Sequence, residues 1–202
     1  MSQLASNRYG VALAPGGLIL TQELLNTTSA GKPRLPDLLD DVEQAELWLA
    51  GAVNAWALRT GRRAAPVGAV EIGEARLPRI RALRTRLRAA LAGDREEGRE
   101  VDGAGISGTI TLTLRGGNAV DAEPRGDGLA WLKSTLLLES YLSQRDDTWR
   151  RLKVCRNPIC RAAFYDQSNN NSGVWHNVHV CGNAANLRAS RARRRDQVGA
   201  PR

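Results

Sequence analysis

The chain has 202 residues, a hydrophobic content of 42% and a formal net charge of +8. This length allows a folded core plus one small additional module, and no apolar run approaches the ~20 residues that a membrane-spanning helix requires. The first residues also lack the basic-then-apolar profile of a secretory signal peptide, so we expect a cytoplasmic protein with reduced thiols and no membrane partner.

The net charge is concentrated near the C-terminus. Residues 1–150 contain 19 basic and 19 acidic side chains, whereas residues 151–202 contain 10 basic and 2 acidic ones. A basic segment of this kind is typical of proteins that bind a polyanion, most often nucleic acid. The alternative is a solvated basic terminus without a partner.

The N-terminal part is expected to be mainly helical. A short helix is predicted through Leu24 and Leu25, followed by a polar loop over residues 26–36. Apolar residues at helical spacing then predict a helix from Asp37 to about residue 57, with acidic residues in its first turn. Trp48 and Trp56 of this helix are expected to enter the core.

A second helix is predicted over residues 78–92, since proline is favourable at the first helical position. Leucine and isoleucine residues form one stripe along it, and arginines occupy much of the remaining surface: Arg79, Arg81, Arg84, Arg86 and Arg88. Such a basic face is usually solvated, although an acidic partner is the alternative. We therefore expect these arginines to face water.

The stretch Gly103-Ala-Gly-Ile-Ser-Gly108 has the glycine spacing of a dinucleotide-binding loop. That motif requires a strand before it and a helix after it, whereas here a charged loop precedes it and an alternating segment follows. Residues 109–114 and 119–123, separated by a glycine-containing turn, predict a β-hairpin instead. A third helix is predicted over residues 128–143.

All cysteines and histidines of the chain lie between residues 155 and 181. Cys155 and Cys160 are separated by four residues, as are His176 and Cys181, and fifteen residues separate the two pairs. This spacing is typical of a structural zinc site with four ligands. His179 is the alternative to His176, but the repeated four-residue gap favours His176.

The cysteines have three other interpretations: isolated buried thiols, a disulfide framework and a catalytic zinc site. Isolated buried thiols are unlike this clustering, and the odd number of cysteines does not favour a disulfide framework. A catalytic zinc would need an open ligand position and a nearby acid, for which Asp166 is the local candidate. Closed sites are the norm for such spacing, so we expect one structural Zn²⁺, no catalytic residues and no enzymatic activity.

The segment around the predicted zinc site suggests a knuckle, a hairpin and a helix. Residues 162–165 predict a strand, and a return strand is predicted to begin at Val174. A helix over residues 184–195 follows, with Asn183 as its predicted N-cap. The side chains predicted to contact nucleic acid are the arginines of this helix: Arg188, Arg191, Arg193, Arg194 and Arg195.

These residues resemble the CGNR zinc-finger family. The resemblance rests on Cys155-x4-Cys160, Phe164-Tyr-Asp166, Trp175 and Cys181-Gly-Asn183, followed by a basic helix. In bacteria this module follows an ABATE domain, in proteins described as stress-induced transcriptional regulators. Leu24-Leu-Asn-Thr27 and the acidic start of the helix near Asp40 are similar to that domain.

The chain departs from the family pattern at three positions. His176 stands where the family usually has a third cysteine, which keeps a zinc ligand and favours His176 over His179. Ala184 replaces the arginine of the family's name motif, and Asn186 replaces a usual basic residue. Both of the latter changes remove positive charge beside the metal and shift the expected nucleic-acid contact toward Arg188 and the arginines that follow.

The combined prediction is an α+β protein, mainly α. Residues 1–150 are expected to form an ABATE-like helical domain with a small β-hairpin, which senses a small-molecule ligand or forms a homodimer. Residues 151–202 are expected to form a treble-clef-like zinc module that binds double-stranded DNA as part of a transcriptional regulator. The alternative is a small-molecule-binding or protein-interaction protein whose zinc site is purely structural.

Overall fold

The computed structural model describes residues 4–29, 34–62, 72–92, 105–184, 186–187 and 190–191. Its helices are α1 (Leu18–Asn26), α2 (Val42–Thr60), α3 (Leu77–Ala92) and α4 (Gly128–Arg145), with 3-10 turns at Ala5–Tyr9, Glu74–Arg76 and Trp149–Arg151. Two antiparallel hairpins, β1 (Ile110–Leu114) with β2 (Val120–Pro124) and β3 (Leu152–Val154) with β4 (Ala163–Tyr165), make the protein α+β and mainly α. None of the described helices combines the length and apolar character needed to cross a membrane.

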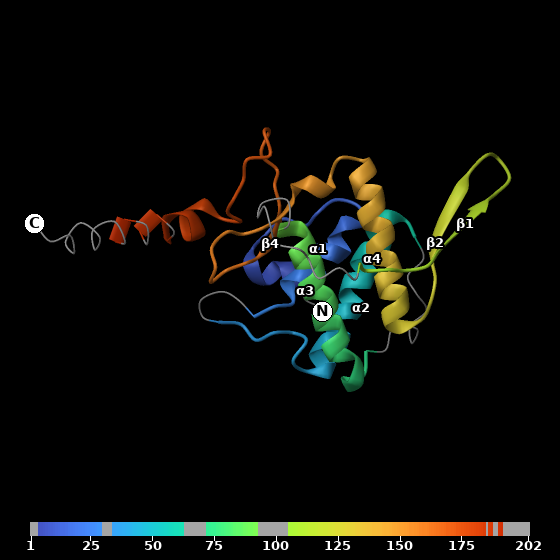
Figure 1. Cartoon of the computed structure of the whole chain (residues 1–202), viewed down its shortest axis with the longest axis horizontal. Helices are drawn as coiled ribbons and strands as arrows, with labels where there is room; N and C mark the ends of the chain where they lie inside the picture. Colours follow the sequence, from blue (N-terminus) through green and yellow to red (C-terminus); the bar gives the residue numbers. More distant parts are fainter. Residues whose placement is uncertain are drawn as a thin grey trace, which may run out of the picture.

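Helix α1 lies at the centre of the helical body (Figure 1). All nine of its residues are buried, and it contacts α2, α3, α4 and β4. Its leucines and Ile19 supply much of the core, which also contains Trp48 and Trp56 of α2, as predicted. The Trp56 ring meets Trp131 of α4 edge-to-face, with ring centroids 5.7 Å apart, a favourable aromatic arrangement.

Four polar side chains of α1 are buried with it, and three of them bind backbone groups. Gln22 accepts a hydrogen bond from the Ala14 N–H at 2.6 Å, and Glu23 accepts from the Ala5 and Ser6 N–H groups at 2.6 and 3.0 Å. Burial raises the pKa of Glu23 above its ordinary value, while these hydrogen bonds act in the opposite direction. The N-terminal segment is therefore fixed to the core by buried polar contacts.

The helix predicted over residues 78–92 matches α3 closely. The helix predicted to begin at Asp37 begins later, at Val42. Helix α2 begins at Val42 because Asp41 is its N-cap and accepts a hydrogen bond from the Gln44 N–H at 2.8 Å. Asp37, where the helix was predicted to begin, forms a separate turn in which its carboxylate accepts from the Leu39 N–H at 2.9 Å. The acidic residues before α2 thus belong to a capped turn.

The arginines of α3 do not form a uniformly solvated face, contrary to the prediction. Arg84 is buried and makes two hydrogen bonds of 2.7 Å to the Asp37 carboxylate. Arg88 donates to the carbonyl oxygens of Leu25 and Arg161 at 2.5 and 2.6 Å. Burial, with repulsion from Arg161 as the next cause, lowers the pKa of Arg88 to about 10. A guanidinium has several donors on an apolar stem, so it can connect backbone segments inside the fold.

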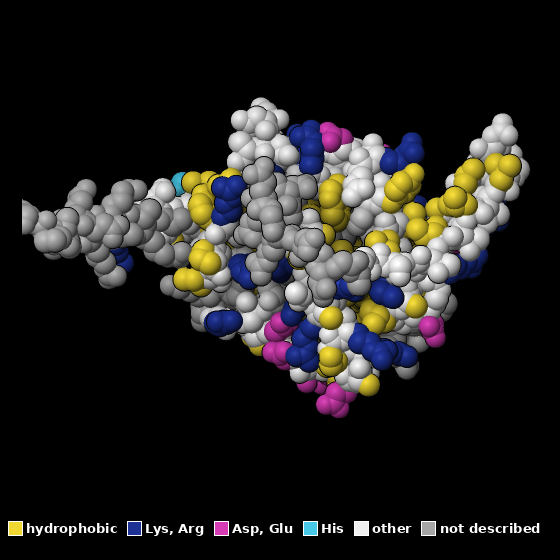
Figure 2. Space-filling model, in the orientation of Figure 1, with side chains coloured by type: hydrophobic (Ala, Val, Ile, Leu, Met, Phe, Trp, Pro, Cys, Tyr) yellow, Lys and Arg dark blue, Asp and Glu magenta, His cyan; other side chains and the backbone are white. Residues whose placement is uncertain are grey.

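The first hairpin confirms the prediction for residues 109–123. It projects from the body (Figure 1), and its paired residues run from Ile110 opposite Pro124 to Leu114 opposite Val120. One face carries apolar side chains, which appear along the projecting hairpin in Figure 2. The other face carries Arg115, which forms ion pairs with Asp121 and Glu123.

The second hairpin is paired differently from the prediction. Residues 163–165 form β4 as expected, but β4 pairs with β3, which precedes the first cysteine, and not with a return strand at Val174. Val174 contributes a single backbone hydrogen bond, from the Arg156 N–H to its carbonyl at 3.1 Å. The link between β3 and β4 is short enough for the two strands to pair directly. The predicted knuckle, which contains Cys155 and Cys160, is the turn that connects them.

Asn26 joins the helical body to this second hairpin. Its carboxamide accepts a hydrogen bond from the Ala163 N–H at 2.8 Å and donates to the Ala163 carbonyl at 2.9 Å. The carboxamide therefore takes the place of a neighbouring strand for one residue of β4, Ala163. Leu152 and Ala163 of the hairpin are also part of the main core.

We predict that Asn26→Ala lowers the free energy of unfolding by about 2–4 kcal/mol, because the buried N–H of Ala163 loses its acceptor and the Ala163 carbonyl keeps only a longer contact of 3.5 Å with Gln22. Chemical denaturation of the zinc-loaded protein measures the change. Asn54→Ala, at an exposed position of α2, is the matched control and should stay within about 0.5 kcal/mol of the wild type. Equal effects of the two substitutions would contradict the proposed role of Asn26.

Candidate metal centre

The first ligand pair lies on the turn between β3 and β4. The Cys155 N–H donates to the Ala162 carbonyl at 2.8 Å, which closes the ladder, and the Cys160 N–H donates to the Asn157 carbonyl at 2.9 Å. Pro158 occupies this turn as expected, and Arg161 leaves it in a left-handed conformation with φ 53°. The tight turn brings the two sulfurs to the same side of the chain.

In the second pair, Cys181 lies in a short π-helical turn, Val178–Gly182, and His176 precedes that turn. Asn177 caps this turn, since its side chain accepts from the Val180 N–H at 3.0 Å and its carbonyl from the Cys181 N–H at 2.9 Å. Asn183, the predicted N-cap, is already helical, with φ −61° and ψ −41°. Asn183 is therefore not the N-cap, because the helical segment begins before the last cysteine and includes it.

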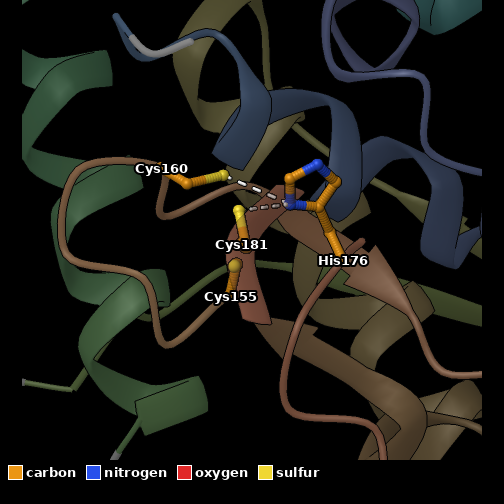
Figure 3. A group of neighbouring side chains, drawn as sticks. All are labelled: Cys155, Cys160, His176 and Cys181. Atoms are coloured by element: carbon orange, nitrogen blue, oxygen red, sulfur yellow. Dashed lines mark hydrogen bonds between the residues drawn. The ribbon is translucent and has the colours of Figure 1, made fainter. Parts of the chain in front are cut away.

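The four predicted ligands converge (Figure 3): the Sγ atoms of Cys155, Cys160 and Cys181 and a ring nitrogen of His176 all lie within 4.8 Å of one another. The His176 Nδ1 is 3.3 Å from the Cys160 Sγ and 3.5 Å from the Cys181 Sγ. Ligand atoms around a tetrahedral zinc lie about 3.5–3.8 Å apart, because its bonds are about 2.0–2.3 Å long. The donor set and its spacing therefore fit one structural zinc ion. His179 is exposed and is not in this group.

The protonation of the thiols also favours a cation at this point. Hydrogen bonding from Cys160 lowers the pKa of Cys155 to about 4, whereas the same interaction raises the pKa of Cys160. Burial raises the pKa of Cys181. Without a positive charge among them, the three sulfurs do not ionise together. A divalent ion compensates the repulsion and allows each thiolate to bind it.

The site is enclosed by apolar side chains from both ends of the chain. The three cysteines are buried with Val11, Ala162 and Phe164, and Tyr9 and Trp175 pack against them. A Cβ at Gly182 would lie 3.2 Å from Cδ1 of Trp175 and 3.4 Å from a methyl group of Val178. The glycine after the last cysteine thus allows the indole ring to pack closely beside the metal site.

A buried ion pair supports the loop between the two ligand pairs. The Lys153 ammonium donates to the Asp166 carboxylate at 2.6 Å and to the carbonyls of Asn171 and Gly173 at 2.6 and 3.1 Å. Asp166 also accepts from the Ser168 and Gly173 N–H groups. From the sequence, Asp166 is a residue of the family pattern and a candidate catalytic acid, and no role is predicted for Lys153. The sequence contained one indication of its role: Lys153 is one of only 3 lysines among 29 basic residues, so a lysine at this position is unusual for the chain.

Burial alone would raise the pKa of Asp166, but the hydrogen bonds from Lys153, Ser168 and Gly173 lower it below its ordinary value. The carboxylate therefore stays charged and occupied by the loop. The ion pair of Lys153 and Asp166 holds the loop so that the chain after it runs back beside the turn that carries Cys155 and Cys160. There the Val174 carbonyl accepts a hydrogen bond from the Arg156 N–H, and the His176 ring lies next to the Cys160 sulfur.

The comparison with protein families agrees with this geometry. The family model of the CGNR zinc finger matches residues 151–194. This segment is a CGNR zinc finger. No curated protein matches the chain. The matched region does not include residues 1–150, so the similarity of that part to an ABATE domain stays a prediction.

The zinc finger continues beyond Cys181 as a helical segment. Of its residues that the structure describes, Ala184 is half-buried, whereas Asn186, Leu187 and Arg191 are exposed. Among the arginines predicted to contact nucleic acid, Arg191 alone is described. The others, Arg188, Arg193, Arg194 and Arg195, lie outside the described residues.

We predict that His176→Ala lowers zinc affinity at least about tenfold, since even the loss of a partner that only supports a ligand costs 10–100-fold. Competition with a chromogenic chelator, with total zinc determined by mass spectrometry, measures this. His179→Ala is the matched control and should retain one zinc per chain. If the His179 variant released zinc and the His176 variant retained it, the fourth ligand would be His179 and not His176.

We also predict that Asp166→Asn lowers the free energy of unfolding at pH 7 by about 3–5 kcal/mol, because it leaves the Lys153 charge buried without its partner. The folded-state pKa of Asp166 is depressed, so its contribution is complete above the unfolded-state pKa and is lost as the pH falls through the folded-state value. The difference from the wild type should therefore be constant above about pH 5 and shrink below about pH 4. Denaturation series at several pH values test this, with Asp147→Asn, in an exposed pair with Arg150, expected to show no measurable change.

Proposed function

We propose that this protein is a DNA-binding transcriptional regulator in which the zinc finger presents a basic helix and the helical body has a sensing role. The observation that carries this proposal is the position of the helical segment after Cys181. Its described residues extend away from the helical body (Figure 1), and Asn183, Asn186, Leu187 and Arg191 are exposed. A helical segment whose described residues are exposed in this way is accessible to the groove of a duplex.

Charge distribution supports the same proposal. Residues 151–202 carry the whole net positive charge, since the preceding residues are formally neutral. In the body, Arg84 and Arg88 are committed to internal contacts. The excess positive charge that can attract a polyanion therefore lies in the zinc finger and the residues after it. We propose a non-enzymatic role for the metal, which holds the helix in place.

The salt dependence of binding to mixed-sequence duplex DNA tests the proposal. We expect binding by the zinc-loaded protein at low salt, with log K falling by about 0.9 per phosphate contact for each unit of log salt. Replacement of Arg188, Arg191 and Arg195 by Gln should weaken binding and reduce the slope by about three.

The matched control replaces three body arginines that are exposed, Arg59, Arg79 and Arg145, by Gln, and thus removes the same charge. It should bind nearly as well as the wild type. An absence of binding even at low salt, or equal losses in the two triple variants, would contradict a specific role for the C-terminal helix.

A second candidate function is protein interaction through a zinc finger whose metal is purely structural. The observation in its favour is a group of exposed apolar side chains on the finger: Ile159, Val178, Val180 and Leu187 are between 53% and 63% exposed. Ala184 and Asn186, which replace basic residues usual in the family, point in the same direction. Failure of the DNA experiment would favour this function.

A further inference from the structure

An open cavity of about 520 Å³ lies where the first hairpin meets α4, distant in the chain from the metal ligands. Its lining includes two cations, Arg125 and Lys133, the hydroxyl residues Ser107, Thr109 and Ser134, and Gly126. The volume is within the range of about 300–1,000 Å³ that is usual for small-molecule sites. None of the described lining residues is acidic.

The wall of this cavity is formed by a close approach of the hairpin to the helix. A Cβ at Gly108 would lie 2.8 Å from the Cα of Ser134, and a Cβ at Gly126 would lie 2.7 Å from the Cβ of Ala130. Gly126 also has a φ of 106°, which favours glycine. The last glycine of the G-x-G-x-x-G pattern therefore has a packing role that needs no dinucleotide.

Hydrogen bonds fix the same wall. The Thr109 N–H donates to the Ser134 hydroxyl at 3.0 Å, and that hydroxyl donates to the Ala130 carbonyl at 2.9 Å. The base of the hairpin thus has a defined position on α4 before any ligand binds. Such preorganisation lowers the entropic cost of binding.

The electrostatics of the cavity favour an anion. Lys133 is half-buried, and within the described part of the chain it has no hydrogen-bond or ion-pair partner. Arg125 contacts Glu123 at 3.0 Å and the Thr111 hydroxyl at 2.8 Å, but both members of that ion pair are about half exposed. Exposed pairs contribute little free energy, so Arg125 can exchange its partner for a ligand.

We propose that this cavity binds a small anion with two negative charges, held between Lys133 and Arg125. The shared chemistry is that of a compact dianion, either a phosphate or a dicarboxylate, because two cations line a space that the hydroxyl residues Ser107 and Thr109 also line. The proposal gives a site to the sensing role in the proposed function and rests on that role, but not on DNA binding.

The test is a titration of the full-length, zinc-loaded protein, followed by amide chemical shifts in a phosphate-free buffer at constant ionic strength. Inorganic phosphate and succinate are the two probes, and the one that binds more tightly decides between the two sources. We expect saturable shifts at Gly108 and Gly126, with none at Gly116 and Gly117 in the turn at the hairpin tip. Lys133→Gln should weaken binding about tenfold or more, whereas Lys133→Arg should retain it.

Arg125→Gln should also weaken binding, and Arg115→Gln is its matched control. Arg115 belongs to the same hairpin and is ion-paired with the same Glu123, but it does not line the cavity. Absence of saturation with both probes, full affinity in Lys133→Gln, or equal losses in the two arginine variants would overturn the proposal. DNA binding is measured on the same samples. Because the anion titration requires no DNA, a failure of the anion site and a failure of DNA binding are observed independently of each other.

Discussion

The carboxamide of Asn26 satisfies both the N–H and the carbonyl of Ala163, and the position of the zinc finger on the body depends on this contact. A two-stranded hairpin of three-residue strands has little stability of its own. Here one strand receives a further hydrogen-bonding neighbour from a buried helix. Because β3 ends beside Cys155, the amide also fixes the first ligand pair relative to α1. Asn26 thus connects the helix to the metal site, and Gln22 of the same helix adds a longer contact of 3.5 Å to the Ala163 carbonyl.

Apolar packing has the same consequence. Leu152 and Ala163 belong to the main core, while Val11 and Tyr9 from the N-terminal segment pack with the cysteines. The residues that enclose the metal therefore come from both ends of the chain. Zinc binding requires deprotonated, assembled ligands, so its free energy is coupled to folding of the finger. Through these contacts the coupling reaches the helical body.

Buried charge is used inside this protein as well as at its surface. Arg84 and Arg88 of α3, and Lys153 beside the metal loop, bind carboxylates or carbonyl oxygens of other segments. Each of these cations is buried at low cost only because its hydrogen bonds are satisfied. Their positive charge is therefore not available to a partner. This distinguishes them from Lys133, which lines a cavity whose described lining residues include no carboxylate.

The sequence by itself determined the features that depend on short separations. Helical periodicity predicted α2, α3 and α4, alternation predicted the first hairpin, and two four-residue gaps predicted the cluster of Cys155, Cys160, His176 and Cys181. These patterns are local, because a turn, a helix face or a chelate pair is set by residues close together in the chain. Only the tertiary structure decided that β4 pairs with β3, and that Asn26 binds a residue 137 positions away. A hydrogen-bonding group in the sequence can find many partners, and the packing of the whole core selects the one that it meets.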